Sequence, residues 1–236
     1  MTQLRYFPYA SETAVGNMAF DSAMLYTCLP REQVLWRFYG WTEPAITFGY
    51  SQNCEWVRQR IDPFGGACIR RLTGGGIVDH RNDLTYSLAI PATHSFHRTP
   101  AQDIYRDLHQ GIADVLSSAG IMADLAPCPG PCEQAESQKT GVCFQSPEPF
   151  DVIAPDSGLK MAGAAMKRTK EGVLIQGSLS RLAVNLPEKE RLIAGFKVFL
   201  EKWLVASSTM EAEPISRDII SREELRFASS KWNLKR

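Results

Sequence analysis

Residues 70–80 contain the densest group of atoms that could do chemistry. Arg70 and Arg71 precede the three consecutive glycines 74–76, whose backbone N–H groups can approach a ligand closely because no side chain shields them. An anion or a carbonyl oxygen would bind well in such a loop, although a hairpin turn with solvated arginines gives the same pattern. The loop matches neither the dinucleotide-binding fingerprint nor the P-loop, which disfavours nicotinamide and Walker-type chemistry.

Lys160 is a lone cation within residues 158–165, a run of apolar and small residues typical of a strand. An unpaired charge is costly to bury, so this side chain should face a ligand or the solvent. A lysine at an exposed sheet edge is the commoner case, because edge lysines prevent edge-to-edge aggregation.

Cys143 is a candidate nucleophile, since a thiol becomes reactive where a nearby cation or dipole lowers its pKa. A buried, unreactive cysteine is the commoner case. Cys128, Cys132 and Cys143 do not have the spacing of a standard zinc site, and no histidine lies within ten residues of them, so we expect no metal. Three of the four histidines are expected to be structural or exposed, and only His80 adjoins the glycine loop: the three are His94, His97 and His109.

The helices that must position these residues follow from the spacing of apolar side chains. Helices are predicted at residues 15–28, from a capping box at Thr99 to Gly120, at about 187–203, and in a short segment opened by a capping box at 221–224. Residues 126–140 contain three prolines and no periodic apolar pattern, which predicts a lid-like loop beside the site.

Strands are predicted where aromatic, β-branched and alternating apolar residues recur. Residues 33–40 and 45–50 should pair across a turn, and the alternation in residues 84–90 predicts one buried face. The other predicted strands are residues 67–72, 77–80, 150–154, 159–166 and 172–179.

The composition is that of an ordinary folded protein, with 44% hydrophobic and 22% charged residues, and a length of 236 residues suits a single domain covering 1–236. The formal net charge of zero removes the electrostatic attraction expected of a nucleic-acid binder. The N-terminus has no signal-peptide pattern and no apolar run approaches about 18 residues, so we expect a cytoplasmic protein without a membrane partner.

Five segments in order along the chain together resemble the catalytic domain of the lipoate-protein ligase and lipoyl/octanoyl transferase family, which shares its fold with biotin protein ligases. They are residues 17–21, 38–44, 48–52, 70–80, and 160–163 with Gly177. The resemblance implies an α/β (α+β) fold with a mixed central sheet flanked by helices. It also implies an acyl tunnel that ends at the glycine loop and at Lys160.

The same resemblance implies roles for individual residues. Lys160 would contact the acyl carbonyl and, where ATP is used, the adenylate phosphate. Cys143 would carry the acyl group as a thioester, because residues 143–160 resemble the cysteine segment of the Gram-positive-type octanoyltransferases, although the segment is slightly longer here. The substrate-binding residues implied are Arg70, Arg71, Thr73, Gly74, Gly75, Gly76, Val78, His80, Gly163 and Ala164.

Three activities remain open within this resemblance. An octanoyltransferase would need no cofactor and would move an octanoyl group from acyl carrier protein to a lysine of a lipoyl-domain protein, such as a glycine cleavage H protein or a 2-oxoacid dehydrogenase E2. A lipoate-protein ligase would need ATP and Mg²⁺ and usually a further domain, for which the chain leaves little room. The three glycines resemble the ligase pattern more than the transferase pattern.

A noncatalytic lipoyl-binding protein is the third alternative. Biotin ligation is disfavoured because the basic glycine-rich loop of that branch is missing. The histidine that often precedes the family's second glycine motif is absent, with Gln176 before Gly177.

Overall fold

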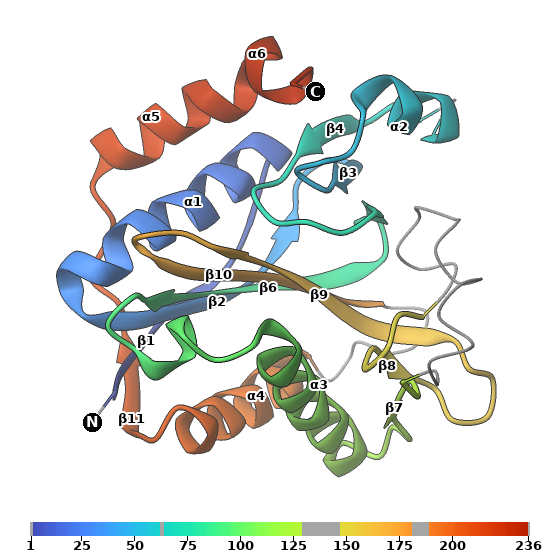
Figure 1. The fold of residues 1–236 in the computed structure, drawn as a ribbon, viewed down its shortest axis with the longest axis vertical. Helices are drawn as coiled ribbons and strands as arrows, with labels where there is room; N and C mark the ends of the chain where they lie inside the picture. Colours follow the sequence, from blue (N-terminus) through green and yellow to red (C-terminus); the bar gives the residue numbers. More distant parts are fainter. Residues whose placement is uncertain (1, 62–63, 129–146, 181–188, 236) are drawn as a thin grey trace.

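The computed structural model of the chain describes residues 2–61, 64–128, 147–180 and 189–235. Most of the predicted lid-like loop at 126–140 falls outside the described residues, and so does the candidate nucleophile Cys143. The described part is a mixed α/β fold with helices on both faces of a large sheet, as the sequence predicted (Figure 1).

Within the described ranges, the large sheet has eight strands in the order β11-β1-β2-β6-β10-β9-β8-β7. β1 pairs in parallel with β2 and β11, and the other pairs are antiparallel, so the sheet is mixed. The strands are β1 (Thr2–Glu12), β2 (Gln33–Trp41), β6 (Asp83–Pro91), β7 (Asp124–Leu125), β8 (Val152–Ile153), β9 (Lys160–Arg168), β10 (Gly172–Ser180) and β11 (Ala206–Glu211).

A second sheet of three strands has the order β4-β3-β5 in the described part of the chain. Its strands are β3 (Ala45–Phe48), β4 (Ala67–Arg70) and β5 (Ile77–Asp79). The predicted pairing of residues 33–40 with residues 45–50 is therefore wrong. Both edges of β2 are already hydrogen-bonded, to β1 and to β6, so β3 has no free edge of β2 to join.

The helices are α1 (Ala14–Arg31), α2 (Cys54–Ile61), α3 (Ala101–Ser118), α4 (Lys189–Trp203), α5 (Arg217–Ala228) and α6 (Ser230–Asn233), with a 3₁₀ turn at Ser95–His97. α1, α3 and α4 lie close to their predicted positions. None of the described helices is long and apolar enough to cross a membrane.

Two predicted helix starts are wrong. Thr99 does not cap α3; Pro100 stands at the N-cap without a side-chain hydrogen bond, and the Thr99 hydroxyl bonds the carbonyl of Ser95 instead. The capping box at 221–224 does not open a helix, because α5 begins one turn earlier. Ile219 and Ile220 of that earlier turn pack against the core formed with α1, which extends the helix beyond its local sequence signal.

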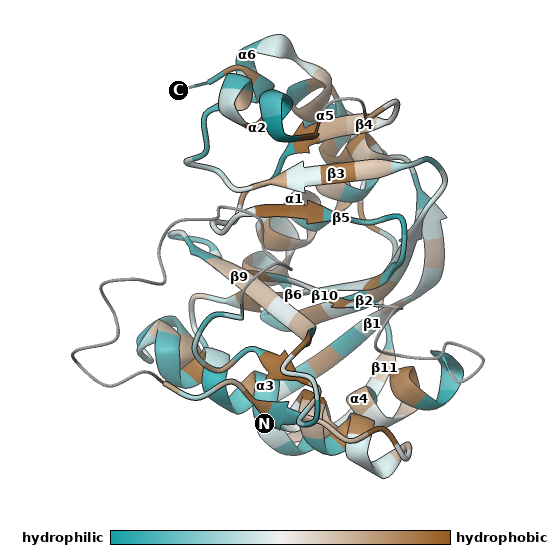
Figure 2. Cartoon of the chain, turned by 90° about the vertical axis from the view of Figure 1, so that its right-hand side faces the viewer, coloured by the Kyte–Doolittle hydropathy of each residue, from teal (hydrophilic) through white to brown (hydrophobic). Residues whose placement is uncertain are grey.

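The elements form layers on either side of the large sheet, as Figure 1 and the view of Figure 2, turned by 90°, both show. α3 and α4 cover one face, where they share a hydrophobic core with the central strands. α1 covers the other face, and α5 packs on α1. The small sheet and α2 lie on this second side. Beyond the part of the face that α1 covers, the small sheet faces β9 and β10 across an open space.

Both faces of the central strands are buried, and the two faces differ in chemistry. On β6, Leu84, Tyr86, Leu88 and Ile90 belong to the core under α3 and α4. The alternate residues are also buried although most are polar: Asp83, Thr85 and Ser87, followed by Ala89. The sequence predicted one buried face here; the structure buries both, because the polar face is covered by α1 and the small sheet.

α3 contributes a buried histidine to the core under the sheet. The His109 side chain is completely buried, and its Nδ1 donates a hydrogen bond to the Phe150 carbonyl at 2.8 Å. Burial lowers the pKa of His109 from its usual 6.5 to about 4, since desolvation disfavours the imidazolium. The folded protein therefore holds a neutral imidazole.

We predict that this histidine makes the fold sensitive to mild acid. The folded-state pKa lies below the unfolded one, so the unfolded chain binds more protons between about pH 6.5 and 4, and stability falls as the pH is lowered through this window. The loss in the free energy of unfolding caused by this histidine reaches about 3 kcal/mol at about pH 4. His109→Asn keeps a hydrogen-bond donor for the Phe150 carbonyl and removes the titrating ring. The free energy of unfolding in urea should depend less on pH for this variant than for the wild type or for the control His97→Asn. Parallel pH profiles for all three would contradict the prediction.

Candidate active site

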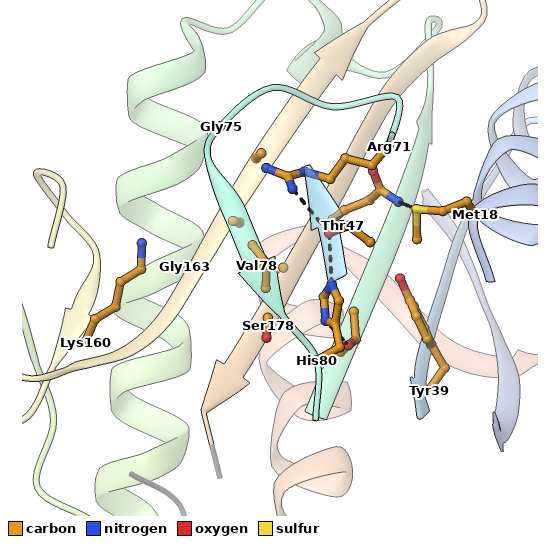
Figure 3. A pocket seen from close by; sticks show the side chains of 15 residues that line it. Met18, Tyr39, Thr47, Arg71, Gly75, Val78, His80, Lys160, Gly163 and Ser178 are labelled. Atoms are coloured by element: carbon orange, nitrogen blue, oxygen red, sulfur yellow. Dashed lines mark hydrogen bonds between the residues drawn. The ribbon is translucent and has the colours of Figure 1, made fainter. Parts of the chain in front are cut away.

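A pocket lies between the polar face of the large sheet and the small sheet. Its lining comes from α1, β2, β3, β5, β6, β9 and β10 and from the glycine loop (Figure 3). Seven of the predicted site residues line it: Arg71, Gly75, Val78, His80, Lys160, Gly163 and Ala164. Residues more than 80 positions apart in the chain therefore meet in one pocket.

Lys160 opens β9, and its side chain is almost completely buried. Its Nζ lies 2.6 Å from Oδ2 of the buried carboxylate of Asp151. A Cβ atom on Gly163 would come within 2.5 Å of Lys160 Cε and 2.7 Å of Nζ, so the lysine lies directly over this glycine. The alternative of a solvent-facing edge lysine is excluded, and the side chain lies at one side of the pocket, which it helps to line (Figure 3).

The glycine loop is held by close backbone packing. Gly75 has a positive φ of 86°, a conformation that favours glycine. A Cβ atom on Gly49 would come within 1.9 Å of the Gly75 carbonyl oxygen, so the two backbones approach as closely as only glycine permits. Arg71 donates to the carbonyl of Gly74 through Nε at 3.1 Å and Nη2 at 2.5 Å. The loop is thereby a fixed wall of the pocket.

A buried carboxylate on α1, Asp21, connects this loop to the large sheet. Asp21 accepts hydrogen bonds from Arg37 (Nη2 at 2.6 Å), the Tyr39 hydroxyl (2.9 Å), Ser87 (2.6 Å) and Gln176 Nε2 (2.7 Å). Burial and the neighbouring Asp21 raise the pKa of Tyr39 well above 10, so the phenol stays protonated and donates. Gln176 in turn accepts from the hydroxyl of Thr73 at 2.8 Å, which ties the first residue of the loop to the network.

A second polar chain reaches the same loop from β6. His80 Nδ1 lies 2.6 Å from Asp83 Oδ2, and Nε2 lies 2.9 Å from the Thr47 hydroxyl. The Asp83 carboxylate accepts this bond, so Nδ1 of His80 carries a proton. The Thr47 oxygen accepts from Arg71 Nη1 at 3.2 Å, and Arg71 binds Gly74.

Arg70 is not brought into the pocket with the predicted residues that line it. Its guanidinium does not line the pocket; it donates to the backbone carbonyls of Tyr50, Gln52, Trp232, Asn233 and Lys235. Arg70 and Arg71 follow one another at the end of β4, and successive residues of an extended chain point in opposite directions. Arg71 therefore lines the pocket, whereas Arg70 fastens α6 to the small sheet. The predicted substrate contact of Arg70 is therefore not supported by its position, which is outside the lining of the pocket.

The other predicted residues of the glycine loop lie beside the pocket and do not line it. Thr73 contacts the lining residue Gln176, Gly74 lines an adjacent groove with Gly75, and Gly76 completes the loop. Cys143 lies outside the described residues. Among the residues that the structure describes, no three His, Cys, Asp or Glu side chains cluster to hold a metal ion.

Several residues that build the pocket were not among the predicted site residues. They are Met18, Tyr39, Thr47, Thr85, Gln176 and Ser178 in the lining, and Asp83, Tyr105 and Asp151 behind it. The polar alternation of residues 83–87 and 176–178 within otherwise apolar strands was a signal that could have located part of this set.

A family model described as the lipoyl protein ligase A/B catalytic domain matches residues 13–195, which hold both the glycine loop and Lys160. The chain belongs to this family. Its sequence is 32% identical over 178 residues to the octanoyltransferase LipM of Oceanobacillus iheyensis, covering 74% of this chain and 62% of that protein. The corresponding protein of Bacillus subtilis is 30% identical over 181 residues, covering 74% of this chain and 64% of that protein. The chain thus spans about three fifths of the length of the curated relatives it matches.

The fold also matches solved structures of this lipoyl protein ligase family. A lipoate-protein ligase A bound with ATP superimposes with a TM-score of 0.68 at 16% identity, covering 99% of this chain and 98% of that chain. A second match comes from the structure described as a bi-partite lipoate protein ligase and its E2 lipoyl domain from Thermoplasma acidophilum. One chain of it gives a TM-score of 0.69 at 16% identity, covering 100% of this chain and 98% of that chain. At this identity the likeness supports the fold alone, and it confirms the predicted mixed central sheet flanked by helices of the lipoate-protein ligases.

We predict that Gly49→Ala displaces the glycine loop without unfolding the protein. The new methyl group would collide with the backbone of Gly75, which cannot rotate away as a flexible side chain would. A shift of about 1 Å in a positioned group can cost about 10²-fold in rate, so ligand binding or turnover should fall by that order. Gly65→Ala is the matched control, because its Cβ would meet nothing within 4 Å. Wild-type ligand binding and turnover in Gly49→Ala would contradict the prediction that the position of the glycine loop controls the site.

Proposed function

We propose that residues 1–236 act as one catalytic domain that transfers an octanoyl or lipoyl group to a lysine of a lipoyl-domain protein. The observation that carries this proposal is the buried ammonium of Lys160 over Gly163, in the same pocket as the backbone of Gly75. A cation and backbone amides at one site suit the oxygen of an acyl carbonyl, where negative charge develops during transfer. The similarity to proteins named octanoyltransferase supports the choice of acyl group.

In the proposed reaction, the thiolate of Cys143 attacks the carbonyl carbon of an octanoyl thioester. A tetrahedral intermediate forms, the C–S bond to the carrier breaks, and the carrier thiol leaves with a proton. The amine of the acceptor lysine then attacks the acyl-cysteine, forms the amide and releases the Cys143 thiol. Lys160 and the loop amides would stabilise the oxyanion in both halves of the reaction.

A ligase reaction with ATP and Mg²⁺ is the second candidate, and the likeness to an ATP-bound ligase favours it at the level of the fold. Lys160 and the amides of residues 74–76 would fit a phosphate oxygen as well as a carbonyl oxygen. The proposed acceptor in both cases is a lipoyl domain of the H-protein or E2 type, and in the transferase the donor is acyl carrier protein. A noncatalytic lipoyl-binding protein would bind the acyl group and transfer nothing.

Incubation of the purified chain with a lipoyl domain should separate these activities. We predict that octanoyl-acyl carrier protein alone adds an octanoyl mass to the acceptor, without ATP, and that a hydroxylamine-sensitive adduct forms on Cys143. Cys143→Ser should abolish transfer, because an alkoxide is not available at neutral pH as a thiolate is. Strict dependence on lipoate, ATP and Mg²⁺ would identify a ligase. An adduct on Cys128 or Cys132 would contradict the role of Cys143.

Lys160 should matter under either reaction. Loss of one preorganised oxyanion contact costs about 10²- to 10³-fold in kcat, so Lys160→Ala should lose at least this much. Lys160→Arg should not restore the rate, because a planar guanidinium cannot place a compact charge over Gly163. Lys170→Ala is the control, since the Lys170 side chain is 91% exposed. Steady-state rates near wild type for Lys160→Ala with both acyl donors would refute the assignment of the site.

A further inference from the structure

Asp151 is a completely buried carboxylate that no step of the proposed reaction uses. It lies between the groove residue Phe150 and β8, and its oxygens have different partners. Oδ2 lies 2.6 Å from Lys160 Nζ and accepts from the backbone N–H of Glu148 at 2.7 Å. Oδ1 accepts from the hydroxyl of Tyr105 at 2.5 Å.

The backbone immediately before Asp151 is strained and held in place. Phe150 has a φ of 67°, a conformation that is costly for a residue with a Cβ and persists only where surrounding contacts enforce it. Its N–H donates to the Ala126 carbonyl at 3.0 Å, and its carbonyl accepts from His109 Nδ1 at 2.8 Å. These contacts turn the chain so that the next side chain, that of Asp151, points inward to Lys160.

Tyr105 extends the support to the pocket wall. Its hydroxyl, which donates to Asp151, lies 3.4 Å from the backbone N–H of Ala164, a lining residue on β9. Burial and the neighbouring Asp151 raise the pKa of Tyr105 well above 10, so this hydroxyl keeps its proton and remains a donor. The carboxylate is thus bound by α3 on one side and by β9 on the other.

We propose that Asp151 is a positioning residue for the acyl-transfer site, which fixes the ammonium of Lys160 over Gly163 and limits its motion. The inference rests on the proposed role of Lys160. An ammonium has three N–H donors, so a bond to Asp151 is compatible with a second bond to an acyl oxygen. A carboxylate this close to a developing oxyanion would otherwise repel it. The bonds from Tyr105 and Glu148 draw its charge away from the pocket, which makes the arrangement tolerable.

Asp151→Asn removes the charge and keeps the shape of the side chain. We expect kcat for octanoyl transfer to fall about 10²-fold while KM for the donor changes by less than about threefold, because the cation moves and the pocket does not. Asp151→Glu should not restore kcat, since the carboxylate would be displaced by one methylene. Asp156→Asn is the matched control, because Asp156 is exposed in the turn between β8 and β9.

A second readout does not depend on transfer. Trace labelling with acetic anhydride, followed by mass spectrometry, reports the reactivity of each lysine amine. Lys160 should react several-fold faster in Asp151→Asn than in the wild type or Asp156→Asn, because the carboxylate that holds its nitrogen in place is lost. Tyr105→Phe should give a smaller increase, and it carries the test if thermal melting shows that Asp151→Asn does not fold.

The outcomes separate this inference from the proposed function. A wild-type kcat in Asp151→Asn, alongside an inactive Lys160→Ala, would overturn the positioning role and leave the proposed function standing. Unchanged labelling of Lys160 in both Asp151→Asn and Tyr105→Phe would overturn it as well. Lys160→Ala with full activity would instead remove the proposed function, and the labelling result would still decide whether Asp151 holds the lysine.

Discussion

The buried carboxylate of Asp21 is the interaction on which the rest of the site depends. A carboxylate removed from water is strongly destabilising unless charged and polar donors replace the solvent. Arg37, Tyr39, Ser87 and Gln176 supply these donors, so a single group fixes the relative positions of α1, β2, β6 and β10. The polar residues on the α1-facing side of the sheet are therefore necessary for burial of Asp21, and they also form the base of the pocket.

The glycines impose a second constraint, because they let backbone and side chains approach where a Cβ would not fit. Gly49 admits the loop carbonyl of Gly75, and Gly163 admits the side chain of Lys160. Two hydrogen-bond chains then reach the loop, one through Gln176 to Thr73 and one through His80 to the neighbourhood of Gly74. Packing against the glycines sets how closely the loop and the lysine approach the sheets, and the two hydrogen-bond chains set the orientation of the loop.

The sequence located the residues that short-range patterns reveal and missed those that depend on tertiary contacts. The apolar spacing placed α1, α3 and the strand around Lys160 correctly, since these signals lie within a few residues of one another. The strands β1 and β11 were missed, because β1 is only half-buried and β11 joins it from the other end of the chain. The pairing of Lys160 with Asp151 was equally hidden, as was the engagement of Arg70 by α6, because no local pattern records which distant group neutralises a buried charge.

The electrostatics of the pocket favour one type of substrate over another. Lys160 is bound to Asp151, and Arg71 is bound to Gly74 and Thr47, so both pocket cations already have fixed acceptors. Lys160 beside its counter-ion exerts little net field on a neutral thioester in the ground state, yet its N–H groups can strengthen a bond as charge develops on the carbonyl oxygen. Stabilisation that appears only in the transition state accelerates a reaction, whereas tight binding of the ground state does not. A substrate that arrives with several negative charges would need surplus cations, and the ion pair with Asp151 offsets the charge of Lys160. This ion pair therefore suits the thioester reaction proposed above better than a reaction in which several phosphate charges enter the pocket.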